Sequence, residues 1–185
     1  DVLDALEPGG LFRWERFYGS SKCDRRGPLG YGFTHAYEHE LELYPQAWRY
    51  RGPDDTVIDF EPPTIARPES INGGMRLRLV GSCMVELSHR GDPTLRFILP
   101  EGRRRGSARL VELSRRRRVL RLQHREERLE GFIEQNDSGA EVRFVLEYDD
   151  LGHIVALWRH AEGTRTCLAR YVYDRTRSVL QGARD

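Results

Sequence analysis

Hydrophobic and polar residues alternate along much of the chain with a period of two, the pattern of a strand that has one buried face. In the clearest case, Phe144, Leu146 and Tyr148 alternate with Val145 and Glu147. Residues 149–152, Asp-Asp-Leu-Gly, have turn chemistry, and residues 153–158 form an apolar return strand. We therefore predict a β-hairpin, which is too small to bury its apolar face without neighbours.

The same hairpin pattern recurs further along the chain. Tyr148-Asp149 is followed by Tyr173-Asp174, and the spacing is 173 − 148 = 25 residues. At this offset residues 120–124 align with residues 145–149 as a degenerate first copy. Aliphatic residues occur at matching positions in the three copies, namely Leu129, Ile154 and Val179. A fixed period of this size is typical of stacked repeats.

A second informative block lies near the start of the chain. Residues 11–18 are rich in aromatic side chains, which favours a strand with Phe12, Trp14, Arg16 and Tyr18 on one side. Residues 19–21, Gly-Ser-Ser, end this strand. Residues 25–33 contain regularly spaced glycines, which predict a tight turn under Trp14. Residues 34–44 alternate again and predict one continuous, half-exposed strand.

The middle of the chain predicts a series of further short strands. They are expected at residues 57–60, 75–80, 84–89, 95–99 and 109–113, the last leading into an arginine-rich turn. Residues typical of turns separate them at regular intervals, as in 52–55 (Gly-Pro-Asp-Asp) and 72–74 (Asn-Gly-Gly). No segment is predicted to be helical, so the expected fold class is all-β.

Composition is consistent with a folded β domain. Of 185 residues, 38% are hydrophobic and 32% are charged, with a net charge of +1, a balance that favours a globular protein over disorder. No apolar run reaches the roughly 18 residues of a membrane-spanning helix. The first residues have neither an initiating Met nor a signal peptide, so we expect a segment of a longer chain. The three cysteines indicate neither a disulfide framework nor a metal site.

One motif suggests metal chemistry. Residues 35–39, His-Ala-Tyr-Glu-His, match the H-x-x-E-H pattern of zinc metalloproteases. That chemistry requires a helix, on which two imidazoles four residues apart meet at one metal. On the strand predicted here they would lie roughly 13 Å apart. We therefore expect His35 and His39 to pack and hydrogen-bond beside Tyr37, without metal or cofactor.

Clusters of charge suggest two other kinds of site. The arginines of residues 103–105 and 115–118 are candidates for phosphate binding, but no aromatic residues for base stacking lie between them. Solvated loops are the favoured interpretation, and nucleic-acid binding is not expected. The carboxylates of Glu126, Glu127 and Glu130, and of the pair Asp149 and Asp150, are candidates for acid–base chemistry. We assign no catalytic residue.

Two motifs together resemble one protein family. Residues 148–154, Tyr-Asp-Asp-Leu-Gly-His-Ile, resemble the YD repeat of bacterial Rhs proteins. Residues 13–18 (Arg-Trp-Glu-Arg-Phe-Tyr), 27–33 (Gly-Pro-Leu-Gly-Tyr-Gly-Phe) and 34–38 (Thr-His-Ala-Tyr-Glu) are similar to the domain that opens the repeat region in this family. The resemblance implies antiparallel β-hairpin repeats of the Rhs shell type. Residues 1–110 are then the strand-rich opening domain and residues 111–185 the first, truncated repeats.

The resemblance also implies a function. Rhs chains form a hollow shell around a C-terminal toxin, and we expect this chain to be a non-catalytic part of such a wall. The implied partners are the rest of the same polypeptide, including the toxin, and spike or chaperone proteins of a type VI secretion apparatus. The polypeptide is expected in the bacterial cytoplasm before export and in target cells after delivery. The residues expected to build the architecture are Trp14, Tyr18, Gly30, Gly32, Tyr37, Tyr148, Asp149, Gly152, Tyr173 and Asp174.

Two alternatives belong to other classes of protein. One is a binding module of the β-sandwich type, which recognises carbohydrate or nucleic acid through exposed aromatic residues and arginines. The other is an enzyme built on His35, Glu38 and His39.

Overall fold

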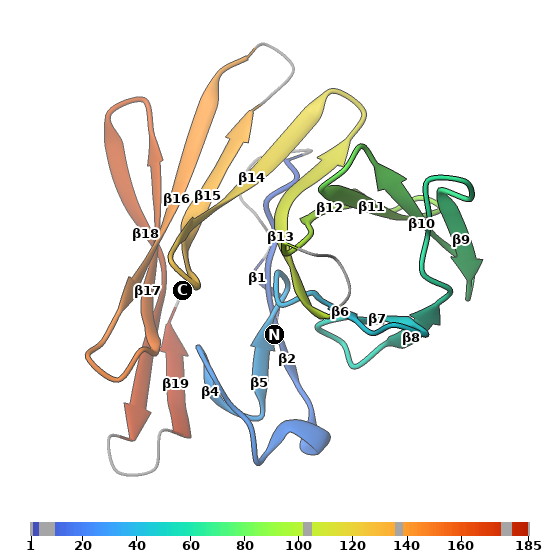
Figure 1. The fold of residues 1–185 in the computed structure, drawn as a ribbon. Coiled ribbons are helices and arrows are strands. Elements are labelled where there is room, and N and C mark those ends of the chain that lie inside the picture. Colours follow the sequence, from blue (N-terminus) through green and yellow to red (C-terminus); the bar gives the residue numbers. More distant parts are fainter. Residues whose placement is uncertain (1, 4–9, 102–104, 136–138, 175–178, 185) are drawn as a thin grey trace. The chain divides into compact units, whose positions relative to one another are not determined.

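The fold is all-β, as predicted from the sequence. The computed structural model describes residues 2–3, 10–101, 105–135, 139–174 and 179–184, and its strands pair in antiparallel fashion (Figure 1). Within the described residues the helical structure is one 3-10 turn, η1 (Ser20–Lys22). None of these residues forms a helix of the length and apolar character needed to cross a membrane.

The chain divides into two compact units. Unit 1 comprises Asp1–Ala36 together with Leu120–Asp185, and unit 2 comprises Tyr37–Val119. The compact units therefore differ from the sections predicted from the motifs, which were separated at residue 110. The boundary at residue 110 divides the chain into two consecutive sections. Unit 1 instead combines the first 36 residues, whose described part we call the N-terminal block, with the hairpins at the C-terminal end.

Unit 1 contains short N-terminal strands and a run of long hairpins. Its elements are β1 (Val2–Leu3), β2 (Trp14–Tyr18), η1, β3 (Arg26–Gly27), β4 (Gly30–Tyr31), β5 (Phe33–His35), β14 (Arg118–Arg125, in unit 1 from Leu120), β15 (Arg128–Gln135), β16 (Glu141–Tyr148), β17 (Ile154–Ala161), β18 (Thr164–Asp174) and β19 (Val179–Arg184). Each strand from β14 to β19 pairs with the next along the chain. The predicted hairpin at residues 144–158 is therefore β16 and β17.

An aromatic cluster forms the centre of the unit 1 core. Phe12 stacks on Phe144 with ring centroids 3.6 Å apart, and it meets the edge of Phe132 at 5.2 Å. Trp14 packs against the same Phe132 ring at 6.3 Å. The N-terminal segment thus supplies two side chains that the buried faces of β15 and β16 pack around.

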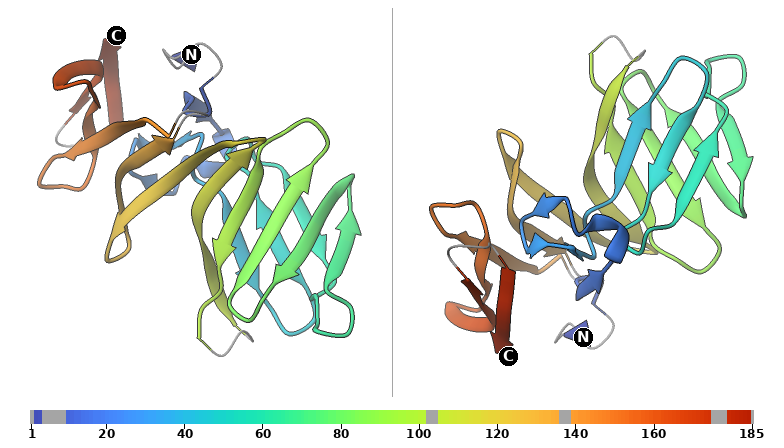
Figure 2. Two further views of the ribbon diagram at one scale, coloured as in Figure 1. Left: turned by 90° about the horizontal axis from the view of Figure 1, so that it is seen from above. Right: turned by 90° about the horizontal axis from the view of Figure 1, so that it is seen from below.

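Unit 2 consists of β6 to β13. Its strands are β6 (Glu40–Leu43), β7 (Trp48–Arg51), β8 (Val57–Phe60), β9 (Glu69–Asn72), β10 (Met75–Val80), β11 (Met84–His89), β12 (Thr94–Ile98) and β13 (Gly106–Arg115). The first part of β13 pairs with β6 and the rest with β12, so the strands follow the order β8-β7-β6-β13-β12-β11-β10-β9. Figure 2 shows β6 to β8 as one layer and β9 to β13 as a second layer over it.

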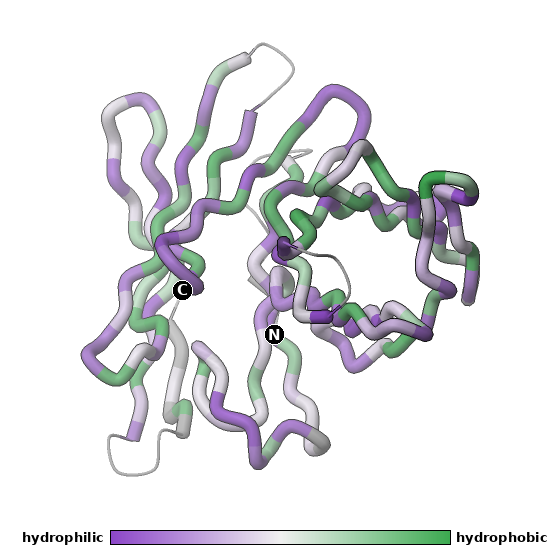
Figure 3. Tube along the Cα trace, viewed as in Figure 1, coloured by the Kyte–Doolittle hydropathy of each residue, from purple (hydrophilic) through white to green (hydrophobic). Residues whose placement is uncertain are grey.

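Several predicted strands match the structure residue for residue. The strands predicted at residues 57–60, 75–80 and 84–89 are β8, β10 and β11, and residues 109–113 lie within β13. Figure 3 shows hydrophobic and hydrophilic residues following one another along the strands of this unit, and in β10 the two kinds alternate from Met75 to Leu79. On β6 the alternation is strict, since Leu41 and Leu43 are buried and Glu40 and Glu42 are half-buried.

The prediction of one continuous strand over residues 34–44 is wrong. The chain forms β5, turns at Ala36 and Tyr37, and resumes as β6 at Glu40. His35 is buried in unit 1, whereas Leu41 is buried in unit 2. A local alternation reports that side chains are buried but not in which core, so the pattern continued across the boundary between the units.

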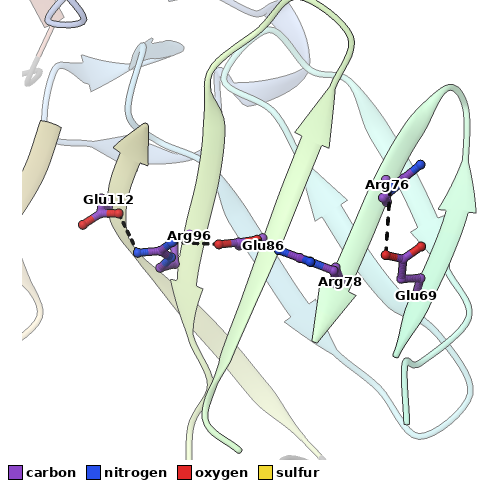
Figure 4. Close-up of polar contacts among 6 residues, drawn as sticks. All are labelled: Glu69, Arg76, Arg78, Glu86, Arg96 and Glu112. Atoms are coloured by element: carbon purple, nitrogen blue, oxygen red, sulfur yellow. Dashed lines mark hydrogen bonds and ion pairs between the residues drawn. The ribbon is translucent and has the colours of Figure 1, made fainter. Parts of the chain in front are cut away.

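A row of charged side chains crosses β9 to β13 of unit 2 (Figure 4). Glu86 accepts hydrogen bonds from Arg78 at 2.6 Å and from Arg96 at 2.7 Å, and Arg96 also donates to Glu112 at 2.7 Å. Arg76 and Glu69 make a longer contact of 3.9 Å at the end of the row. Glu86 lies between two arginines on neighbouring strands, so it joins β10, β11 and β12 through side chains.

We expect Glu86→Gln to lower the free energy of unfolding by about 2 kcal/mol at neutral pH, because two guanidinium groups lose their anionic acceptor. Burial alone would raise the pKa of Glu86, but the bonds from Arg78 and Arg96 outweigh it and the pKa lies below its ordinary value. The stabilisation is therefore complete above the unfolded-state pKa of about 4.3. It is lost as the pH falls through the lower folded-state pKa.

Urea denaturation at a series of pH values measures both effects of Glu86→Gln. The matched control is Glu69→Gln, which removes only the 3.9 Å contact to Arg76 and should have a much smaller effect. Equal losses in the two variants, or the same acid sensitivity in Glu86→Gln as in the wild type, would contradict a central role for Glu86 in this row.

Candidate functional site

The two Tyr-Asp pairs make the same contact in successive hairpins of unit 1. The Tyr173 hydroxyl donates to the backbone carbonyl of Ile154 at 2.7 Å, and the Tyr148 hydroxyl donates to the carbonyl of Leu129. In both cases the acceptor lies 19 residues before the tyrosine. The period found in the sequence is therefore also a period of contacts, in which each tyrosine bonds to the preceding hairpin.

The tyrosine rings repeat a second contact with the preceding hairpin. The Tyr148 ring lies under the guanidinium of Arg128 at 4.8 Å, and the Tyr173 ring stacks on His153 with centroids 4.6 Å apart. Arg128 and His153 occupy equivalent positions, each 20 residues before its tyrosine. Burial raises the pKa of Tyr173, so its hydroxyl keeps the proton that it donates. We call these two arrangements the Tyr148 corner and the Tyr173 corner.

Asp149 organises the turn between β16 and β17. Its Oδ1 accepts hydrogen bonds from the amides of Leu151 at 3.0 Å and His153 at 2.8 Å. Burial would raise its pKa, but hydrogen bonds, led by the one from the His153 amide, hold the pKa below its ordinary value. Gly152 lies in this turn with φ of 84°. Asp174 ends β18, and the turn that follows it lies outside the described residues.

The alignment of the first repeat copy is out of phase by one residue. Residues 120–124 were aligned with 145–149, which places Leu120 on Val145. Leu120 is buried and Val145 is exposed, so the equivalent of Leu120 in the structure is the buried Phe144. The offset between these strands is then 24 residues, while Leu129 and Ile154 keep an offset of 25. The turn after β14, residues 126–127, is also shorter than the turn after β16, residues 149–153.

A loop of the N-terminal block contacts the turn between β16 and β17. Arg26 donates through Nε to His153 Nε2 at 3.3 Å and through Nη2 to the carbonyl of Leu151 at 2.7 Å. The amide of Ile154 donates to the carbonyl of Pro28 at 2.8 Å, and Leu29 is fully buried. The sequence analysis missed Arg26 and His153, because neither has a distinctive place in a strand pattern.

Trp14 forms a second connection between the N-terminal block and the hairpins. Its Nε1 donates to the Tyr171 hydroxyl at 2.6 Å, and its ring stacks on His35 at 5.0 Å. The buried carboxylate of Glu134 accepts the amides of Leu11 at 2.6 Å and Phe12 at 3.2 Å. Tyr171 was not predicted as a site residue, although it lies on the same face of β18 as Tyr173 and the alternation contained that signal.

Tyr18, Gly30 and Gly32 lie together in the N-terminal block. Gly30 and Gly32 have φ of 85° and 77°, and a β-carbon on Gly32 would lie 2.9 Å from Tyr18 Cε2. The neighbour that requires glycine at position 32 is therefore Tyr18, whereas a turn under Trp14 was predicted. Tyr18 is itself exposed, and its hydroxyl lies 3.4 Å from Cys23 Sγ.

The H-x-x-E-H motif is not helical. His35 ends β5 and packs on Trp14, and His39 Nδ1 lies 2.7 Å from the Tyr50 hydroxyl in unit 2. Tyr37 is buried in unit 2. Over the residues that the structure describes, no group of three or more potential metal ligands is found.

The predicted arginine clusters lie mainly in turns. Arg103 and Arg104 lie outside the described residues, and Arg105 is exposed. Arg115 ends β13, and the exposed Arg116 and Arg117 form the turn after it. Glu126 and Glu127 likewise form the exposed turn between β14 and β15. Such exposed turns are the solvated environments that clustered like charges favour.

We expect Tyr173→Phe and Tyr148→Phe each to lower the free energy of unfolding by about 1 kcal/mol, because a backbone carbonyl loses its hydroxyl donor. Tyr148→Ala, which also removes the ring, should lower the melting temperature further. Thermal unfolding of the purified chain measures these changes. The control is Tyr44→Phe, since the Tyr44 side chain is exposed on the surface. Melting temperatures in both corner variants equal to that of the control would contradict an anchoring role.

Comparison with known proteins adds one family match. The family model described as "Domain of unknown function (DUF6531)" matches residues 3–60. No curated protein matches the chain. The matched region includes β2 to β5 of unit 1 and β6 to β8 of unit 2. The chain is thus similar to this domain over the N-terminal block and the first strands of unit 2, while the Tyr-Asp hairpins lie outside the match.

Proposed function

We propose that the chain is a non-catalytic structural segment of an Rhs-type shell, in which stacked β-hairpins form a wall around a toxin at the C-terminal end of the same polypeptide. The observation that supports this most is the repeated tyrosine contact. Tyr148 and Tyr173 each bond to the carbonyl 19 residues earlier. A contact that recurs with the sequence period can be extended to any number of hairpins, which is the requirement for a wall.

The chemistry of the corners also favours architecture over catalysis. The hydroxyls of Tyr148 and Tyr173 are committed to backbone carbonyls, and Oδ1 of Asp149 is committed to backbone amides. Groups held in this way stabilise turns and strand contacts. The proposal needs no metal and no cofactor.

The proposed partners follow from the same picture. They are the remaining repeats of the polypeptide, the enclosed toxin, and spike or chaperone proteins of a type VI secretion apparatus. The polypeptide would be made in the bacterial cytoplasm and delivered into competing cells. A closed wall also removes the exposed strand edges that otherwise promote aggregation.

Limited proteolysis of the complete polypeptide tests the proposal. The region after the repeats should be cut much more slowly within the intact polypeptide than when it is expressed alone. The double variant Tyr148→Ala/Tyr173→Ala should expose it, and the surface variant Tyr44→Ala should not. Equal cleavage rates for the enclosed and isolated regions would overturn the proposal, whatever the variants do.

A binding module is the second candidate, and the layered strands of unit 2 favour it. The strand groups β6–β8 and β9–β13 enclose one core, as in a β-sandwich. Titration with oligonucleotides and glycans at several salt concentrations distinguishes the candidates. Tight, specific binding would favour the module. Stoichiometric zinc in the purified protein would instead favour an enzyme built on His35, Glu38 and His39.

A further inference from the structure

A buried histidine lies between an arginine and an aspartate in unit 1. The side chain of His153 is 1% exposed. Its Nδ1 lies 3.1 Å from Asp149 Oδ2, and its Nε2 accepts from Arg26 Nε at 3.3 Å. The ring also stacks on Tyr173. A histidine in such a place lies within a network of fixed charges, so a change in its protonation state would affect its neighbours.

The contact with Arg26 determines which tautomer is present. A guanidinium has only donors, so His153 Nε2 must offer a lone pair and cannot carry a proton. The proton of the neutral ring is therefore on Nδ1, from which it is donated to Asp149. A second proton, taken from solvent, would have to bind at Nε2. It would replace an acceptor by a donor facing the Arg26 donor, and it would place two cations side by side.

Other charged groups do not remove this conflict. The titratable and charged groups that the structure places beside His153 and its stacking partner include Asp149, Arg26, Tyr173, Tyr171, Tyr148 and Arg16. Asp149 is the anion in this set, and it already faces Nδ1. Arg16 adds a further positive charge near Tyr173. Asp149 therefore stabilises a proton on Nδ1. Arg26 disfavours a proton on Nε2, so the arrangement favours the neutral ring.

We propose that Arg26, His153 and Asp149 form an acid-sensitive latch, in which protonation of His153 at Nε2 releases Arg26 and the loop of residues 26–30 from the turn between β16 and β17. The loop is held there by the Arg26 bonds and by the Ile154 amide, which donates to the Pro28 carbonyl. Release of Arg26 leaves the Ile154 bond as the remaining hydrogen bond of this set. The latch rests on contacts within unit 1 and is independent of the shell proposal.

Hydrogen exchange at the Ile154 amide tests the latch. When the pH is lowered from about 8 to about 5, its protection factor should fall by about tenfold after correction for intrinsic exchange. The Gly52 amide, which donates to the Thr56 carbonyl at 2.8 Å in unit 2, is the internal control. Its protection should stay constant within about twofold. Constant protection at Ile154 would overturn the proposal.

Two variants separate the latch from a general effect of acid. His153→Gln keeps an oxygen acceptor for Arg26 but has no titratable group, so protection at Ile154 should become independent of pH. His89→Gln removes a second histidine paired with an aspartate, since His89 Nδ1 lies 2.7 Å from Asp92 Oδ2. That variant should keep the wild-type profile at Ile154. The same loss in His153→Gln as in the wild type would contradict the latch.

Nitrogen NMR of the wild-type histidines gives a test that needs no substitution. At about pH 8 the spectrum should show His153 protonated at Nδ1 and unprotonated at Nε2. A proton on Nε2 at this pH would be incompatible with the bond from Arg26 and would overturn the proposal. This result does not depend on whether His153→Gln folds.

Discussion

Replacement of Trp14 by alanine is expected to lower the free energy of unfolding by about 4 kcal/mol, the range typical of a fully buried tryptophan. Trp14 is 1% exposed and packs against Phe132 and His35. The substitution also removes the indole donor to Tyr171 at 2.6 Å. Because Trp14 belongs to the N-terminal block and Tyr171 to β18, the loss should separate the two parts of unit 1. Urea denaturation measures the energy, and proteolysis should cut the N-terminal block first.

Trp158→Ala is the matched control for Trp14→Ala. Trp158 is only half-buried, and its ring lies under the guanidinium of Arg165 at 3.8 Å. Its Nε1 donates to the exposed carboxylate of Glu147 at 2.8 Å. Cation–π contacts at such sites contribute about 0.5–1 kcal/mol, so the loss should be clearly smaller. A larger loss at Trp158 than at Trp14 would contradict the central place of Trp14 in the core.

The second large effect is expected at Gly131, where alanine should lower the free energy of unfolding by about 3 kcal/mol or prevent folding. A β-carbon on Gly131 would overlap the carbonyl oxygen of Phe144 and lie 3.3 Å from Val145 Cα. These are backbone atoms of the neighbouring strand, paired with Gly131 and Phe132 in the ladder. Relief of the overlap requires β15 and β16 to separate where Phe132 and Phe144 pack around Phe12.

Gly182→Ala is the control for Gly131→Ala, because a β-carbon on Gly182 meets no atom within 4 Å. Both glycines lie in strands of the hairpin run. The control should change the free energy of unfolding by less than about 0.5 kcal/mol. Chemical denaturation and the yield of folded protein report both variants. A folded Gly131→Ala protein as stable as Gly182→Ala would show that β15 and β16 separate without loss of stability. That result would contradict close packing at Gly131.

Much of the secondary structure was predictable because its causes are local. Side chains of a strand point alternately to its two faces. The alternation of apolar and polar residues was therefore enough to predict strands at residues 75–80 and 84–89. Residues rich in glycine, proline, asparagine and aspartate mark the turns for an equally local reason. The role of Asp149 was predictable because its acceptor and its donor amides belong to one turn.

The pairings that could not be predicted from the sequence join distant segments, even where one partner, such as Trp14, was predicted. Trp14 and Tyr171 are 157 residues apart, and Arg26 and His153 are 127 apart. Gly131 is needed because of Phe144 on the next strand, not because of its own conformation. The local pattern of apolar and polar residues does not show which distant residues come into contact. The error at residues 34–44 has the same origin, since alternation does not distinguish one core from another.

The fold class, the places of most strands and the period of the Tyr-Asp hairpins could be predicted from the sequence, because each depends on the order of neighbouring residues. The contacts that recur with this period became visible in the folded structure. It placed each tyrosine hydroxyl on a carbonyl of the preceding hairpin, and it brought the N-terminal block into contact with β15, β16, β18 and the turn between β16 and β17. These outcomes depend on which surfaces exclude water together, and that choice is made by the folded chain as a whole.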